Sequence, residues 1–204
     1  MRLFKGLLAI AAIAFFVHQI INPSAIIEHA DGILVPGKPL QTATSAKPFS
    51  YGSHKINPLA DLSVTALVVA KKDDYQDQMA SLLPVDLGLT WGELSDSKLL
   101  NNFSFVQKDR KMFIRYPKKL SKLRINFTEL YANMHVVPAN EQVAKILKKI
   151  TVGDIIEMEG QLIEVDTLFW SAASSLSRTD KGDMACEILW IKRLEIITEK
   201  NNFL

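Results

Sequence analysis

The sequence has few of the residue patterns that mark known enzyme classes. Its single cysteine, Cys186, excludes an internal disulfide and any Cys-x-x-Cys metal or redox pair. It also lacks a Gly-x-Ser-x-Gly elbow, a His-Glu-x-x-His sequence and a Walker-type phosphate loop. No catalytic residue, metal site or cofactor is therefore predicted from a motif, and an enzymatic role is not the first expectation.

The chain after residue 23 also has no excess of positive or negative charge. Two of the 24 basic residues, Arg2 and Lys5, precede Ser24, which leaves 22 basic against 22 acidic side chains. A neutral domain has no general electrostatic attraction to phosphate backbones. Nucleic acid is therefore not an expected partner.

The N-terminal residues 1–24 carry the clearest targeting signal. Arg2 and Lys5 stand before an apolar run, 7–17, which is typical of an export segment. No small-x-small cleavage site follows the run, so we expect an uncleaved signal anchor in preference to a cleaved signal peptide. Positive charge before the run places the N-terminus in the cytoplasm. We thus expect a single pass through the inner membrane, with the rest of the chain on its outer side.

Two further regions follow the anchor. Residues 25–58 are rich in proline and glycine and are predicted to form an extended tether. Residues 59–204 are predicted to form a single globular domain, for which a hydrophobic fraction of 48% in the whole chain is sufficient. Without disulfides this domain depends on its hydrophobic core.

Hydrophobic periodicity predicts a mainly β (α+β) fold. Helices are expected at 95–101, where Ser95 is a suitable N-cap, and at 140–150, where Val143, Ile146, Leu147 and Ile150 form an apolar stripe. We expect a small antiparallel β-barrel or curved sheet, with the oligonucleotide/oligosaccharide-binding (OB) type as leading form and one or two packed helices. Strands are expected at 62–70, 103–107, 111–116, 156–162, 169–176 and 186–197.

A polar loop between the last two predicted strands is the strongest candidate for a binding surface. Hydroxyls and a guanidinium can bind an anionic ligand, acidic side chains can bind calcium, and the same residues can simply satisfy the backbone of a long loop. The candidate residues in this loop and its flanks are Ser174, Ser175, Ser177, Arg178, Asp180, Asp183 and Glu187.

His135 is the second point of interest, together with nearby Asn133. An imidazole is a suitable general base, and Cys186 or a nearby serine would be its nucleophile. Because these residues are far apart in sequence, a structural histidine bonded to the backbone is the competing interpretation.

Several separated blocks of the sequence form a recognisable pattern after residue 24. The blocks are 32–39 with Gln41, 84–86, Trp91-Gly92, Ser95-Asp96, 132–135 with Pro138, and Trp170 with 174–178, Asp180, Gly182 and 185–187. In this order they resemble an uncharacterised family of bacterial membrane-anchored envelope proteins. The resemblance spans most of the chain after residue 24 and implies a bacterial origin and an envelope location, without implying a reaction.

Three functions follow as hypotheses. The leading one is a non-enzymatic, membrane-tethered periplasmic module that binds an envelope protein or an anionic ligand through 177–185, Asn133 and His135. The alternative is an envelope hydrolase acting on peptidoglycan, lipid or peptide, in which His135 acts with Cys186 or a nearby serine. The third is a structural assembly subunit, for which an exposed apolar patch is expected around Trp91 or Trp170.

Overall fold

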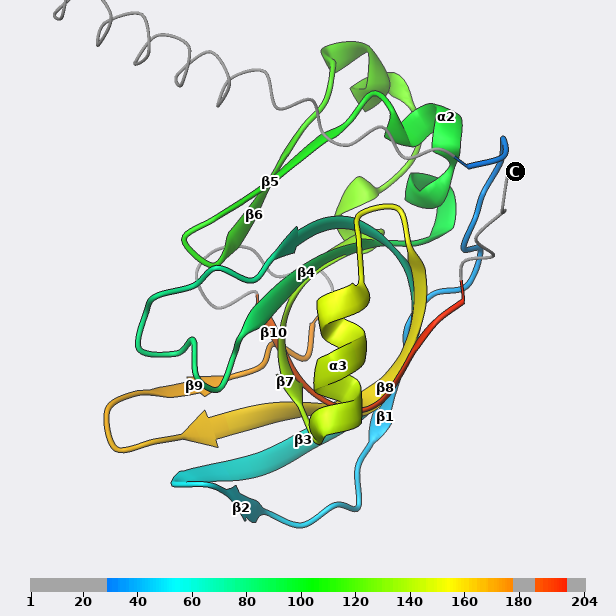
Figure 1. The fold of residues 1–204 in the computed structure, drawn as a ribbon. Coiled ribbons are helices and arrows are strands. Elements are labelled where there is room, and N and C mark those ends of the chain that lie inside the picture. The colour runs from blue at the N-terminus through cyan, green and yellow to red at the C-terminus, as the bar shows by residue number, and fades with distance from the viewer. Residues whose placement is uncertain (1–28, 178–185, 198–204) are drawn as a thin grey trace, which may run out of the picture.

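The computed structural model describes residues 29–177 and 186–197 (Figure 1). These residues form one eight-stranded mixed sheet and one separate β-hairpin, with two short α-helices. The predicted mainly β class with a curved sheet and packed helices is confirmed. The strands are β1 (Leu40–Ala43), β2 (Phe49–Tyr51), β3 (His54–Lys72), β4 (Val85–Thr90), β5 (Ser104–Lys108), β6 (Lys111–Arg115), β7 (Tyr131–Pro138), β8 (Ile155–Asp166), β9 (Ser171–Ala173) and β10 (Glu187–Ile196), and the helices are α2 (Ser97–Leu100) and α3 (Glu141–Lys149).

Five strands close into a ring in the order β3, β4, β7, β10, β8 and back to β3. The β7–β10 pair is parallel and the other four pairs of the ring are antiparallel. Helix α3 follows the third strand of the ring and lies across one end of it (Figure 1). The parallel β7–β10 pair differs from the all-antiparallel arrangement expected from the sequence.

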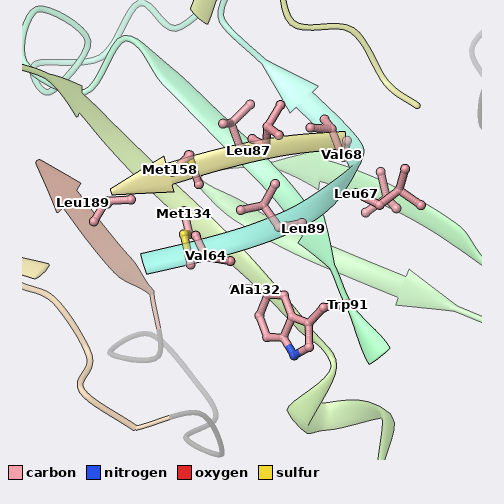
Figure 2. Close-up of a cluster of buried hydrophobic side chains, with 14 of the residues drawn as sticks. Val64, Leu67, Val68, Leu87, Leu89, Trp91, Ala132, Met134, Met158 and Leu189 are labelled. Atoms are coloured by element: carbon pink, nitrogen blue, oxygen red, sulfur yellow. The ribbon is translucent and has the colours of Figure 1, made fainter. Parts of the chain in front are cut away.

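The interior of the ring is filled by side chains from all five strands. Val64, Leu87, Met134, Met158 and Leu189 each come from a different strand and are at most 2% exposed (Figure 2). In β3 apolar residues alternate with polar ones from Ala60 to Ala66, because one face of the strand faces the ring interior. The hydrophobic core therefore lies within the closed sheet.

Helix α3 was predicted from its apolar stripe and is confirmed. Asn140 caps it by accepting a hydrogen bond from the Val143 backbone N–H at 3.0 Å. Val143 and Leu147, followed by Ile150, are buried against the core. The helix thus covers apolar side chains that the ring would otherwise expose at this end.

The contact between β8 and β10 requires a glycine. Gly160 lies opposite Ile191, next to an irregularity in the β10 register. A Cβ atom built at this position would be 2.0 Å from the carbonyl oxygen of Trp190. The two backbones can approach this closely only because residue 160 has no side chain.

Gly160→Ala is expected to lower the free energy of unfolding by about 1–3 kcal/mol, because the methyl group forces the two strands apart. Urea denaturation measures this effect. Gly37→Ala is the matched control, since a Cβ there would meet nothing within 4 Å. Equal stabilities for the two variants would contradict the close approach of β8 and β10.

Beyond the ring, β3 and β8 continue as a paired ribbon with β2 and β9 on its two edges (Figure 1). Phe49 and Tyr51 of β2 pack edge-on against Trp190, at ring-centroid distances of 5.0 and 4.7 Å. Within the described part of the predicted tether 25–58, β1 and β2 therefore belong to the sheet. Their prolines and glycines mark the turns between short strands, which explains why this region was misread as a linker.

No helix within residues 29–177 and 186–197 is long and apolar enough to cross a membrane. The predicted signal anchor, 1–24, lies outside the described residues.

Candidate functional site

A buried carboxylate and an imidazole face each other across β4 and β7. Asp86 and His135 are paired in register, so their side chains lie on the same face of the sheet. The Nδ1 atom of His135 lies 2.8 Å from Oδ1 of Asp86, although the angle falls outside that of a well-formed hydrogen bond. Because Asp86 is fully buried, this contact is an ion pair shielded from solvent.

The thiol of Cys186 completes this arrangement. Cys186 directly precedes β10, which runs parallel to β7 with Glu187 opposite Met134. Continued by one residue, this register places Cys186 on the same face of the sheet as His135. The thiol donates to the Arg110 carbonyl at 3.9 Å, and its proximity contributes to the raised pKa of the His135 imidazole. The thiol is half-buried. Asp86, His135 and Cys186 thus form a carboxylate–imidazole–thiol series, which is the order found at many nucleophilic sites.

The surroundings of His135 favour its charged form. Burial lowers the pKa of this imidazole, but the contacts with Asp86 and Cys186 outweigh burial and raise the pKa from 6.5 to about 9. At neutral pH His135 is therefore an imidazolium in contact with a carboxylate and a thiol.

Arg110 contacts the Asp86 carboxylate from the β5–β6 hairpin. It lies at the tip of the β5–β6 hairpin, where both Asp109 and Arg110 have positive φ angles of 51° and 62°. Its Nη1 atom donates to Oδ1 of Asp86 at 3.1 Å and to the Leu83 carbonyl at 2.8 Å. Its Nε and Nη2 atoms donate to the two carboxylate oxygens of Asp77 at 2.8 and 2.9 Å. These contacts engage both edges of the guanidinium, so Arg110 positions the site and is not free to bind a substrate.

Tyr75, in the loop between β3 and β4, contacts both Arg110 and Asp86. The centroid of the Tyr75 ring lies 3.6 Å from Cζ of Arg110. The Tyr75 hydroxyl donates to Oδ2 of Asp86 at 2.6 Å. Burial, followed by the Asp86 hydrogen bond, raises the pKa of Tyr75. Asp86 thus has three different partners: a hydroxyl, a guanidinium and an imidazole.

Gly88 allows the β5–β6 hairpin to pack closely against β4. Gly88 follows Asp86 on the same face of β4 and lies opposite Asn133. A Cβ at Gly88 would be 2.5 Å from the sulfur of Met112 on β6. The missing side chain therefore lets the hairpin pack on β4 and brings Arg110 to Asp86.

A cavity of about 230 Å³ opens beside the thiol and the imidazole. Its lining is largely apolar, with polar groups near Cys186, which is the usual character of a small-ligand site. The lining residues are Met79, Leu83, Asp109, Arg110, Lys111, His135, Ser171, Ala172, Ala173, Cys186 and Ile188.

Two of the predicted site residues are brought to this region. His135 lines the cavity, and its contacts with Asp86 and Cys186 show that it is not bonded only to backbone. Asn133 accepts from Gln107 at 2.7 Å and donates to the Arg110 carbonyl at 3.0 Å. Asn133 therefore fixes the hairpin over β7 and does not line the cavity.

The predicted serines are occupied in local structure. The Ser174 hydroxyl accepts from the Ile188 N–H at 3.0 Å, and the Ser175 hydroxyl accepts from the Ser177 N–H at 3.0 Å. The Ser174 bond connects the segment after β9 to the start of β10, and the Ser175 bond is local. None of the three serines lines the cavity. Glu187 is buried next to the thiol in sequence. Arg178, Asp180 and Asp183 lie outside the described residues.

The sequence analysis missed Asp86, Arg110 and Tyr75. A usable signal was present for Asp86, because a lone carboxylate among Val85, Leu87 and Leu89 requires a partner when that segment is a buried strand. Within the described parts of the chain, no group of three or more histidine, cysteine and acidic residues is placed to hold a metal ion.

Comparisons with known proteins add no assignment. No family model matches the chain, and no curated protein or solved structure proved similar to it.

Proposed function

We propose that this protein is a thiol-dependent acyl-transfer enzyme of the hydrolase type, with Cys186 as nucleophile, His135 as acid and base, and Asp86 as the group that orients His135. The observation that carries this proposal is that His135 and Cys186, 51 residues apart in sequence, line one cavity, with the buried Asp86 carboxylate 2.8 Å behind the imidazole. This is the alternative that the sequence left open for His135.

The reaction would proceed in two balanced steps. The Cys186 thiolate attacks the carbonyl carbon of an ester or amide, a thioester forms, and His135 gives its proton to the departing alcohol or amine. Water then attacks the thioester carbonyl and neutral His135 accepts a proton from it. The carbon–sulfur bond breaks, the carboxylic acid leaves, and the thiolate–imidazolium pair of the first step is restored. Throughout both steps Asp86 stabilises the imidazolium by its negative charge.

The cavity limits the substrates. Its volume of about 230 Å³ suits a short apolar group, and Met79, Leu83 and Ile188 supply apolar walls. We infer an acyl donor with a small apolar side chain next to the reacting carbonyl.

The proposed cellular location of the enzyme rests on the sequence alone. The basic and apolar segment before Ser24 supports a membrane-tethered, periplasmic enzyme of the bacterial envelope, in keeping with the family resemblance. Peptidoglycan stems, envelope peptides and lipid esters are then the accessible acyl donors.

A second candidate is the non-enzymatic binding module. Leu168 and Phe169, at the tip between β8 and β9, are each 85% exposed. Exposed apolar side chains of this size favour contact with a partner protein of the envelope. This function would depend on Leu168 and Phe169 and would not need the thiol.

The test is acylation of the full chain by p-nitrophenyl butyrate. We expect a burst of p-nitrophenolate and a covalent butyryl group on Cys186, detected by intact mass. Cys186→Ser should abolish both signals, and His135→Gln should slow acylation by about a hundredfold. Ser121→Ala is the control, because Ser121 is an exposed residue that does not line the cavity.

The enzyme proposal is wrong if the wild-type protein and Cys186→Ser release p-nitrophenolate at the same rate. In that case the binding module becomes the better explanation. Its own test is capture of envelope proteins by the wild-type chain, with loss of the same captured protein in a Leu168→Ser, Phe169→Ser variant.

A further inference from the structure

The geometry points to an extended peptide as the substrate, bound as an added strand on the free edge of β9, with its reacting carbonyl delivered to Cys186. This inference rests on the proposed function and names its substrate class. It needs a sheet edge with unpaired backbone groups, a direct path from that edge to the thiol, and room for the peptide.

The edge of β9 offers unpaired backbone groups. β9 is the last strand of the sheet and pairs with β8 alone. The hydrogen bonds from Ser174 N to Ile163 O and from Thr167 N to Trp170 O show that residues 170 and 174 face β8. In an antiparallel pair these positions alternate. Ser171 and Ala173 therefore direct their backbone N–H and C=O groups away from β8, and neither has a backbone partner among the described residues.

The same edge leads directly to the nucleophile. Ser175, the next outward-facing position after Ala173, donates its backbone N–H to the Cys186 carbonyl at 3.0 Å. Ser171, Ala173 and Cys186 all line the cavity. A strand that pairs with Ser171 and Ala173 would therefore end beside the thiol. Main-chain hydrogen bonds to such an edge provide affinity, while pockets for alternate side chains provide specificity.

The residues of β9 leave space for a neighbour. Ser171, Ala172 and Ala173 have small side chains, and the strand contains no proline or charged residue and shows no register shift. Proline, charge and bulges are the devices that usually prevent strands from adding to an edge. Their absence from β9, next to a nucleophile, favours recognition of a peptide backbone.

Two alkylating agents, one with a peptide strand and one without, test this inference on the full, unmodified protein. The probe is acetyl-Ala-Ala-Leu chloromethyl ketone, compared with iodoacetamide, which has no peptide strand. We expect the peptide to alkylate Cys186 much faster than iodoacetamide, relative to their rates with free cysteine. N-methylation of one alanine amide should slow the peptide by about tenfold, and methylation of the neighbouring amide should have little effect, because only alternate amides face β9.

The variant Ala173→Pro gives a second measurement. It removes an N–H that β8 does not use, so alkylation by the peptide should fall about tenfold more than alkylation by iodoacetamide does in the same variant. If Ala173→Pro does not fold, the two methylated peptides on the wild-type protein still decide the question.

The outcomes separate the two proposals. Equal relative rates for peptide and iodoacetamide, with no difference between the methylated peptides, would overturn strand addition even if p-nitrophenyl butyrate acylates Cys186. Failure of that ester to acylate Cys186 would overturn the proposed function and this inference with it.

Discussion

Asp86→Ala is expected to lower the free energy of unfolding by about 3–5 kcal/mol. The substitution removes the carboxylate between Arg110 and His135 and leaves two buried cations close together with less compensation. The Tyr75 hydroxyl loses its acceptor as well. Urea denaturation at pH 7 measures the change, and loss of the carboxylate should also remove the reactivity of Cys186.

Two comparisons make this prediction specific. Asp86→Asn keeps the shape and an acceptor for Tyr75, so it should cost less than alanine, by about 1–2 kcal/mol. Asp73→Ala removes a carboxylate that is 55% exposed and pairs with Lys71, and should change stability by less than about 1 kcal/mol. If Asp86→Ala and Asp73→Ala had equal effects, Asp86 would not be the centre of a buried ionic network.

The second large effect is a loss of stability as the pH rises from about 6.5 to 9. The pKa of His135 is raised to about 9 in the folded protein, whereas an unfolded histidine has a pKa of 6.5. The folded state therefore binds a proton more tightly, and the resulting stabilisation is complete below pH 6.5 and is lost as the pH passes through about 9. For a shift of this size the effect is on the order of 3 kcal/mol.

The measurement is the free energy of unfolding at several pH values between 6 and 10. His135→Gln should remove most of the decrease across this interval, because glutamine has no titrating group. His54 is a useful control position, since it lies at the start of β3, away from the cavity. A decline of the same size in His135→Gln would show that another group is responsible.

Most of the individual elements could be predicted from the sequence, because they depend on local patterns. The strands β5 and β6 correspond to those predicted at 103–107 and 111–116, and α3 was predicted from its apolar stripe. Strand β4 was not predicted, since Pro84, Asp86 and Gly88 are residues typical of turns. In the folded protein Asp86 is neutralised by its partners and Gly88 accommodates Met112, so tertiary contacts outweigh local preference.

Small differences at the ends of elements have the same origin. Ser95 was expected to cap α2, but Asp96 does so, accepting from the Lys98 and Leu99 backbone N–H groups. Ser95 is buried, and its hydroxyl accepts from the Val35 N–H instead. The Ser95 hydroxyl thus bonds to the backbone of Val35, and not to the backbone of α2 as expected from the local sequence.

The closed ring and the site could not be predicted from local patterns. The pairing of β3 with β8 joins residues about a hundred positions apart, for example Asp61 and Gln161. His135 and Cys186 were both recognised as reactive residue types, but their meeting depends on the parallel β7–β10 register. The candidate serines were assigned to ligand binding, whereas the described ones tie β9 to the following segment.

The parallel pairing of β7 with β10 has a consequence for the order in which reactivity appears during folding. A parallel pair needs a long crossover, which here includes α3, β8 and β9. His135 reaches Cys186 only after this whole crossover has been placed, so the nascent chain carries an ordinary thiol until its last strand docks. For the proposed nucleophile, this order delays reactivity to the final step of folding. The rate of Cys186 alkylation would therefore serve as a direct readout of complete folding.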